Sequence, residues 1–331
     1  MPRTLRAQHD SFPLSRPFRI ARGTKTVADV VTVTIGEGDV VGRGEGVPYP
    51  RYGETIDGTL AAIEQVRPLI ERGAGRVELL GAMPAGAARN ALDCALWDLE
   101  ARLAGRSVAS LIGGAPLRSV PSAMTVVIDT PEAMARDVVS IGRVPVLKVK
   151  VDADDPAARI RAVRAAAPRA TLIVDPNESW DQPLVEAMQG VLLETGVALL
   201  EQPVPAGGDG WLAGFAPAVP ICADESVHVA EDLSVVALRY QVVNVKLDKA
   251  GGLTAALELA RAARARGLGL MTGCMVSSSL SIAPALHVAI MSDFVDLDGP
   301  TWLRDDRPGG VGAEDGFIHP AAAGFWGTTA A

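Results

Sequence analysis

The sequence predicts an α/β fold in which a parallel barrel is joined to an α+β capping domain. Charged residues recur at intervals of 22 to 26 residues, each at the end of a short apolar run: Lys150, Asp175, Glu201, Asp224 and Lys246. One strand, one helix and two loops need roughly 25 residues, so this spacing is typical of repeated β/α units. The chain of 331 residues is long enough for such a barrel and a smaller domain. Because the carboxyl ends of barrel strands meet on one face, we expect these charged groups to lie close together.

The amino-terminal part of the chain alternates apolar and polar residues, as strands do. The alternating segments are 18–22, 27–36 and 41–48, and the turn GEGD at 36–39 joins the last two. This pattern predicts an antiparallel meander. Helical periodicity follows at 55–73 and 85–105. Residues 1–115 are therefore predicted to form the capping domain.

The barrel is predicted to cover residues 116–304. Its expected strands are eight apolar runs, at 122–128, 146–150, 171–175, 198–201, 220–224, 242–246, 269–273 and 294–298. Helices are expected between them, several with Asp, Ser or Pro at the start, at 131–141, 156–167, 181–195, 229–238, 252–266 and 278–290. The Gly- and Pro-rich tail, about 305–331, is expected to pack back on the capping domain.

Composition excludes several classes of function. The net charge is −8 and the basic residues are scattered, which argues against a nucleic-acid partner. No apolar run approaches the ~20 residues of a membrane span, and the first residues lack the apolar core of a signal peptide. Three cysteines, Cys94, Cys222 and Cys274, show no CxxC spacing and indicate a reducing compartment. We expect a cytoplasmic protein with a small-molecule partner, with a homo-oligomer left open.

Three carboxylates end consecutive predicted strands: Asp175, Glu201 and Asp224. They offer only hard oxygen donors, without His or Cys beside them, and so suit Mg²⁺ or Mn²⁺ better than zinc. The remaining coordination positions would be left for water and an anionic substrate. The alternative is that each carboxylate pairs with a basic neighbour.

Lys148 and Lys150 lie two residues apart on one strand, so their side chains point to the same face. If that face is the barrel interior, the two ammonium groups repel each other beside a bound cation. One lysine pKa then falls towards the neutral range that a general base needs. The alternative register places Val149 and Val151 inside and leaves both lysines in solvent.

Lys246 ends the strand that follows the three carboxylates. A proton on a carbon held between Lys150 and Lys246 would have an acid or base on each face. Removal from one face and return to the other would invert the stereocentre. The metal would hold a substrate carboxylate and stabilise the enediolate that forms when the α-proton leaves.

Several motifs resemble those of the enolase superfamily, in its muconate lactonizing subgroup. They are KVK (148–150), DPNE (175–178), EQP (201–203), DES (224–226) and NVKLDKAGG (244–252), and the resemblance covers the whole chain. It implies a modified TIM barrel, (β/α)₇β, under an α+β cap, and one Mg²⁺ held by Asp175, Glu201 and Asp224. It also implies that Lys150 and Lys246 are the acid/base pair. Supporting positions under the resemblance are Lys148, Asn177 and Lys249.

The last predicted strand distinguishes between the reactions of this subgroup, which includes cycloisomerases, o-succinylbenzoate synthases, N-acylamino acid racemases and dipeptide epimerases. Asp296 and Asp298 in FVDLDGP resemble the Asp-x-Asp motif with which dipeptide epimerases receive the substrate's α-ammonium group. A muconate, succinylbenzoate or N-acyl amino acid brings no cation to this place. The expected function is Mg²⁺-dependent 1,1-proton transfer at the C-terminal residue of a dipeptide.

The expected dipeptide is L-Ala-D/L-Glu, because IARG (20–23) and YPRYGE (49–54) resemble epimerases of that specificity. By this resemblance Arg22 receives the glutamyl carboxylate, with Arg51 and Tyr52 nearby, and recycling of cell-wall peptides is the implied pathway. In the alternative, Arg22 is a solvated loop residue. The alternative functions are a cycloisomerase or o-succinylbenzoate synthase-type lyase, and an epimerase of a different dipeptide.

Overall fold

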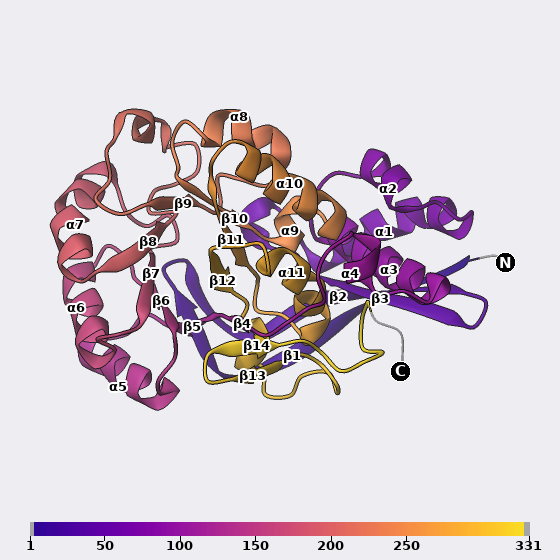
Figure 1. Ribbon diagram of the computed structural model, residues 1–331, viewed down its shortest axis with the longest axis horizontal. Coiled ribbons are helices and arrows are strands. Elements are labelled where there is room, and N and C mark those ends of the chain that lie inside the picture. The colour runs from indigo at the N-terminus through magenta and orange to yellow at the C-terminus, as the bar shows by residue number, and fades with distance from the viewer. Residues whose placement is uncertain (1–2, 328–331) are drawn as a thin grey trace.

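The computed structural model describes residues 3–327 and confirms the predicted fold class. A nearly closed barrel of eight parallel strands carries an antiparallel cap on one side, as Figure 1 shows with the cap in indigo and purple at the right. None of the helices within residues 3–327 has the length and apolar character needed to cross a membrane.

The cap begins with a three-stranded antiparallel sheet. Its strands are β1 (Arg3–Ile20), β2 (Gly23–Glu37) and β3 (Val40–Gly46), in the order β1-β2-β3. The predicted meander is present, but β1 starts well before the expected segment at 18–22. The first part of β1 is largely exposed and has few apolar residues, so the sequence pattern did not reveal it. Its strand conformation is held by backbone pairing with β2, which starts at Arg3↔Glu37.

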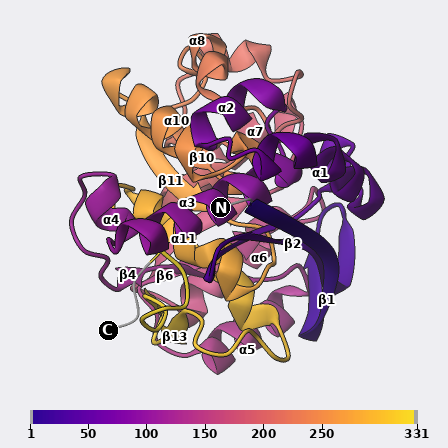
Figure 2. The ribbon, with the colours of Figure 1, turned by 90° about the vertical axis from the view of Figure 1, so that its right-hand side faces the viewer.

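Helices cover one face of this sheet (Figure 2). The predicted pair are α1 (Ile56–Glu71) and α3 (Ala87–Ala104); the short η1 (Pro50–Tyr52), α2 (Arg76–Ala82) and α4 (Val108–Leu111) were not predicted, being too brief for a clear period. β3 carries glycine at every second position facing α3. A Cβ at Gly44 would lie 2.1 Å from the Ala91 carbonyl oxygen. The glycine-rich run of β3 therefore serves close helix–sheet packing.

All eight predicted barrel strands are present and parallel: β5 (Ala123–Val126), β6 (Val146–Lys150), β7 (Thr171–Asp175), β8 (Val197–Glu201), β9 (Ile221–Ala223), β10 (Val242–Val245), β11 (Gly269–Gly273) and β12 (Phe294–Asp296). β12 also lies against β5, which brings the ends of the sheet together. A small apolar layer fills the interior, including Ile173, Leu199, Cys222 and Met271. Cys94 and Cys222 are buried and all three cysteines are free.

The helices between the strands begin at side-chain caps. Thr130, Asp155, Asp181 and Ser278 accept backbone N–H bonds at the starts of α5 (Pro131–Ile141), α6 (Pro156–Ala166), α7 (Gln182–Glu194) and α11 (Ser279–Ala289). The expected α10 (Leu253–Ala265) is also present. The helix expected at 229–238 is divided into η3 (Ala230–Asp232) and α8 (Leu233–Val236), and three short elements were missed: η2 (Gly210–Gly214), α9 (Leu247–Ala250) and η4 (Gly299–Trp302).

The tail contacts both parts of the molecule. β13 (Gly312–Glu314) and β14 (Phe317–His319) form a small sheet with β4 (Val120–Pro121), which directly precedes the first barrel strand. Beyond them, Trp326 Nε1 donates to the Arg43 carbonyl oxygen at 2.9 Å, and Gly327 N donates to Asp98 Oδ1 at 2.8 Å. These contacts tie the last described residues to the cap; the division of the chain at 115/116 stays a prediction.

Candidate active site

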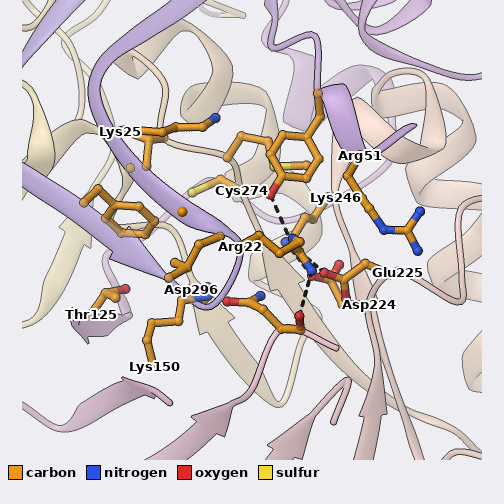
Figure 3. A pocket seen from close by; sticks show the side chains of 18 of the residues that line it. Arg22, Lys25, Arg51, Thr125, Lys150, Asp224, Glu225, Lys246, Cys274 and Asp296 are labelled. Atoms are coloured by element: carbon orange, nitrogen blue, oxygen red, sulfur yellow. Dashed lines mark hydrogen bonds and ion pairs between the residues drawn. The ribbon is translucent and has the colours of Figure 1, made fainter. Parts of the chain in front are cut away.

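A cavity of about 530 Å³ lies between the carboxyl ends of the barrel strands and the cap (Figure 3). The barrel contributes charged side chains from several strand ends, namely Lys148, Lys150, Asp224, Lys246, Asp296 and Asp298. The cap contributes Arg22, Lys25, Tyr49, Arg51 and Tyr52. Val149 and Val151 instead pack in the core outside the barrel, so Lys148 and Lys150 take the inward register.

All three carboxylates are almost completely buried, and Asp224 lines this cavity. Asp175 and Glu201 end β7 and β8, and Asp224 follows β9. Lys148 Nζ lies 3.0 Å from Asp175 Oδ2 and 2.7 Å from Glu201 Oε2. Lys246 Nζ lies 2.7 Å from Asp224 Oδ2. Each carboxylate thus has a lysine partner, as the alternative from the sequence proposed.

Lys150 and Lys246 stand on opposite walls. Lys150 ends β6 and contacts Asp175 Oδ2 at 2.5 Å, while Lys246 directly follows β10. Three strands separate β6 from β10 in either direction around the eight-stranded barrel. A group bound between them would therefore face one ammonium or amine on each side.

The protein's own charges favour protonated lysines. Burial would lower the pKa of Lys148, but the charges of Asp296, Glu201 and Asp175 outweigh burial and raise that pKa well above its usual value. The pKa of Lys246 is also raised: burial opposes its charge, and Asp224 more than offsets burial. The expected lowering of a lysine pKa therefore requires a further positive charge among the carboxylates.

Two supporting residues hold the carboxylates in place. Asn177 donates from its backbone N to Asp175 Oδ1 at 2.8 Å, and from its side chain to Asp175 Oδ2 at 3.2 Å. Lys249 Nζ lies 2.6 Å from Asp224 Oδ1 and donates to the Asn244 carbonyl oxygen at 3.0 Å. Asn177 has a positive φ of 48°, a conformation uncommon outside glycine that these bonds maintain.

The oxygen donors of Asp175, Glu201 and Asp224 are of the kind that bind a hard divalent cation, although their present positions do not form a coordination site. Within the described residues, no three carboxylate, imidazole or thiol groups surround a common point closely enough to hold an ion as they stand. The Lys148 ammonium instead lies beside Asp175 and Glu201. Glu201 Oε2 is buried and its partner is the Lys148 ammonium at 2.7 Å, so this oxygen would become available to an ion only when Lys148 moves. An all-oxygen donor set suits a hard cation such as Mg²⁺, and such an ion would have to displace Lys148 from these oxygens.

Asp296 and Asp298 both line the cavity, on and just after β12. Asp296 Oδ2 lies 2.7 Å from Lys148 Nζ, while its buried Oδ1 has no hydrogen-bond partner. Asp298 Oδ2 accepts from Thr125 N at 2.8 Å and from Trp302 Nε1 at 3.2 Å. Burial, together with the charge of Asp296, raises the pKa of Asp298 to about 6. A cation arriving here would satisfy Asp296 Oδ1.

The cap arginines are held by two carboxylates that sequence reasoning missed. Arg22 Nη2 lies 2.7 Å from Glu225 Oε1, and its Nη1 donates to Glu178 Oε2 at 3.1 Å. Arg51 forms two bonds of 2.8 Å to the two oxygens of Glu178. Arg22 is therefore not simply solvated. Tyr52 packs edge-on against His228, with ring centroids 4.5 Å apart.

The missed carboxylates could have been found from the sequence. Glu178 and Glu225 stand inside the motifs DPNE and DES, directly beside residues that were singled out. Tyr49 likewise stands inside the motif YPRYGE, whereas Lys25 carried no motif and emerges only because the cap folds over the barrel.

A capped barrel with lysines on opposite walls and acidic strand ends defines the class of protein. Residues 3–113 match the family described as mandelate racemase / muconate lactonizing enzyme, N-terminal domain, and residues 131–327 match the family described as enolase C-terminal domain-like. The chain belongs to the enolase superfamily.

Within that superfamily the chain belongs to the dipeptide epimerase family, and it is an isomerase. It is 47% identical to L-Ala-D/L-Glu epimerase of Escherichia coli over 96% of this chain and 99% of that protein. It is 43% identical to N-acetyl-D-glutamate racemase of a Pseudoalteromonas species, over 90% of this chain and 95% of that one.

A solved structure shares nearly the whole fold. An enolase family member from Agrobacterium tumefaciens with homology to dipeptide epimerases, with bound sodium and L-Ala-L-Glu, superposes with a TM-score of 0.96 at 46% identity, covering 98% of this chain and 100% of that chain. A dipeptide epimerase from Enterococcus faecalis, complexed with Mg and L-Leu-L-Tyr, is 29% identical with a TM-score of 0.89, covering 99% of each chain.

Proposed function

We propose that the protein is a Mg²⁺-dependent epimerase of L-Ala-D/L-Glu that inverts the α-carbon of the glutamyl residue. The observation that carries the proposal is the pair Lys150 and Lys246 on opposite walls above three buried carboxylates. The relatives support the substrate, because one at 47% identity is an L-Ala-D/L-Glu epimerase and a neighbour at 46% binds L-Ala-L-Glu.

Asp175, Glu201 and Asp224 would hold one Mg²⁺ per subunit, with Mn²⁺ as a substitute. When bound, the ion would hold the substrate's terminal carboxylate and would stabilise the negative charge that develops as the α-proton leaves. Neighbouring dipeptide epimerases with Mg support this choice of metal.

The two lysines would exchange the proton between the faces of the α-carbon. A neutral Lys150 amine takes the proton from one face while the Lys246 ammonium gives its own proton to the other face. The pair then ends with the opposite protonation pattern, which is the one needed for the reverse reaction. Lys148 contacts Asp175, Glu201 and Asp296; once the ion displaces it from Asp175 and Glu201, it would add a positive charge beside the reacting carboxylate.

The ends of the dipeptide would be received by opposite sides of the cavity. Asp296 and Asp298 accept the α-ammonium group, which satisfies the unpartnered Asp296 Oδ1. Arg22 faces the glutamyl carboxylate, with Arg51 and Tyr52 beside it. We also propose a cytoplasmic setting and a role in recycling cell-wall peptides, as the family resemblance implies.

The relative that acts on N-acetyl-D-glutamate makes an N-acyl glutamate racemase the second candidate. That substrate shares the glutamyl end but carries no ammonium group. It would leave Asp296 Oδ1 buried without a partner, which is costly. The dipeptide is therefore favoured.

Proton NMR in D₂O tests both candidates. With Mg²⁺, L-Ala-L-Glu is expected to lose its glutamyl α-proton signal and to give the second diastereomer, whereas N-acetyl-L-glutamate exchanges much more slowly. EDTA should stop the reaction, and Mg²⁺ or Mn²⁺ should restore it. The variant Asp298→Asn should slow α-proton exchange of the dipeptide more than that of N-acetyl-L-glutamate. Faster exchange of N-acetyl-L-glutamate would overturn the assignment of the amino end.

A further inference from the structure

Unusual backbone conformations gather at the strand ends that carry the carboxylates. Among the described residues, five that are not glycine have a positive φ, and three of these are Asn177, Glu178 and Gln202. Asn177 and Glu178 follow Asp175 at the end of β7, and Gln202 directly follows the end of β8. Such conformations cost free energy and persist only where surrounding contacts hold them. Gln202 belongs to the motif EQP, yet the proposed reaction gives it no role.

The backbone of Gln202 joins three neighbouring strands of the barrel. Its N–H donates to the Cys222 carbonyl oxygen in β9 at 2.8 Å, and its carbonyl oxygen accepts from Glu178 N, beyond β7, at 2.9 Å. The next residue adds a bond of the same kind, because Trp180 N donates to the Pro203 carbonyl oxygen at 2.9 Å. Since β7, β8 and β9 lie side by side (Figure 1), the end of β8 is tied to both of its neighbours.

The side chain of Gln202 is fully buried, and both ends of its amide form hydrogen bonds. Oε1 accepts from Asp224 N at 2.8 Å and from Ser226 N at 3.1 Å. Nε2 donates to the Val204 carbonyl oxygen at 3.0 Å, to Ser226 Oγ at 2.9 Å and to Tyr240 Oη at 3.0 Å. The orientation of the amide is therefore fixed, because its oxygen faces two N–H groups and its nitrogen faces a carbonyl oxygen. Gln202 thus holds the backbone of Asp224 directly.

A further layer of polar groups fixes the partners of the Gln202 amide. Tyr240 Oη donates to Asp209 Oδ2 at 2.7 Å, and Ser226 Oγ donates to the same oxygen at 2.8 Å. Arg239 Nη1 lies 2.8 Å from the other oxygen, Asp209 Oδ1. Asp209 is 1% exposed, so these bonds replace the water that its charge would otherwise need. A buried network satisfied in this way is rigid, and it keeps Gln202 in one conformation.

We infer that Gln202 is a positioning residue for the proposed metal site, and that it fixes the strand ends carrying Asp175, Glu201 and Asp224 relative to one another. This role rests on the proposed function and deepens it, because the three carboxylates repel one another and need rigid support before an ion arrives. The bond from Gln202 reaches the backbone N–H of Asp224, which leaves the carboxylate oxygens to other partners. Groups that orient metal ligands in this way typically contribute roughly tenfold to a hundredfold to metal affinity.

The test measures Mg²⁺ affinity directly, by calorimetric titration of the metal-free protein in the absence of substrate. Gln202→Met keeps the length of the side chain but can neither accept from Asp224 N nor donate to Tyr240 Oη. Its Kd for Mg²⁺ should rise roughly tenfold to a hundredfold. Epimerisation of L-Ala-L-Glu by this variant should be slow at low Mg²⁺ and largely restored at saturating Mg²⁺.

A second variant, Gln202→Asn, keeps the test decisive if methionine is not accepted at a positive φ. Asparagine adopts this conformation more readily, and its amide is one methylene shorter, so it loses the bond from Asp224 N. The same rise in Kd is expected. Melting curves of each variant establish that the titrated protein is folded.

Gln241 provides a matched control at the other end of the same strand. Its Oε1 accepts from the N–H of Ile221, the first residue of β9, at 2.9 Å, whereas Gln202 accepts from Asp224, just after β9. Gln241 is exposed and lies outside the cavity lining. Gln241→Met therefore removes an equivalent bond from β9 and should bind Mg²⁺ as the wild type does. A role confined to stability would lower the melting temperature without changing the Kd of the folded protein.

The outcomes separate this role from the proposed function. Wild-type Mg²⁺ affinity in both Gln202 variants, or an equal rise of Kd in Gln241→Met, would overturn the positioning role while epimerisation stands. If the wild type binds Mg²⁺ but epimerises neither L-Ala-L-Glu nor L-Ala-D-Glu, the proposed function fails. A weakened Mg²⁺ affinity in the Gln202 variants would then still support the role of Gln202.

Discussion

The barrel side of the cavity carries its charges on strand ends, whereas the cap side carries them on turns and a short 3₁₀ helix. The side chains of Lys148, Lys150 and Lys246 are 2%, 8% and 9% exposed, but those of Arg22 and Arg51 are 26% and 38% exposed. Strand ends fixed by neighbouring strands hold groups precisely enough for proton transfer, while exposed turns tolerate exchange of residues. The relatives fit this difference, since they act on glutamyl, Lys-Arg, hydrophobic and aromatic dipeptides.

Replacing the barrel lysines should have the largest effect on activity. Lys150→Ala or Lys246→Ala should each lower epimerisation by about a thousandfold, because each removes the acid or base on one face. Each variant should still exchange the α-proton of one enantiomer with D₂O, and NMR of both diastereomers measures this. Near-normal epimerisation by either variant would contradict the two-base mechanism.

The packed core of the cap should tolerate substitution as poorly as the barrel does, although the cap residues around the cavity are exposed. In Gly44→Ala the new Cβ would lie 2.1 Å from Ala91 O and 2.6 Å from Ala95 N, so α3 has to move. We expect a loss of about 3 kcal/mol in the free energy of unfolding, measured in urea. Gly190→Ala is the control, because its Cβ meets nothing within 4 Å in α7 and should stabilise by about 0.5–1 kcal/mol. Equal effects of the two variants would contradict this packing.

The contact between the two regions has an effect on stability that depends on pH. Asp248, beside the barrel site, accepts from Val47 N at 2.8 Å and from Asn90 Nδ2 at 2.7 Å in the cap. Burial raises its pKa from 3.8 to about 7. The folded state therefore binds a proton between about pH 4 and pH 7 that the unfolded state does not, so this group's contribution to stability falls as the pH rises through that range.

Asp248→Asn keeps an oxygen acceptor and removes the buried charge. Relative to the wild type, the variant should gain about 2–3 kcal/mol of stability as the pH rises from 5 to 8. Thermal melts of both proteins across this range measure it. A stability difference that does not change with pH would show that Asp248 does not titrate there.

Local patterns were sufficient for most of the barrel. Strand runs and helix caps repeat at each β/α unit, so all eight strands and most helices were predicted close to their observed bounds. The early part of β1 was not, because residues such as Gln8 and Ser11 lack an apolar alternation and are ordered by hydrogen bonds to β2. Short elements such as α9 have too few residues for a period.

The sequence by itself determined the barrel and the order of its charged strand ends, because apolar runs and turn spacing are local properties and side chains alternate along a strand. Only the tertiary structure decided which charges are neutralised. Arg22 meets Glu178 across 156 residues of chain, and Asp296 meets Lys148 across 148. Such pairings depend on how the barrel closes and how the cap sits over it, which local sequence patterns do not specify.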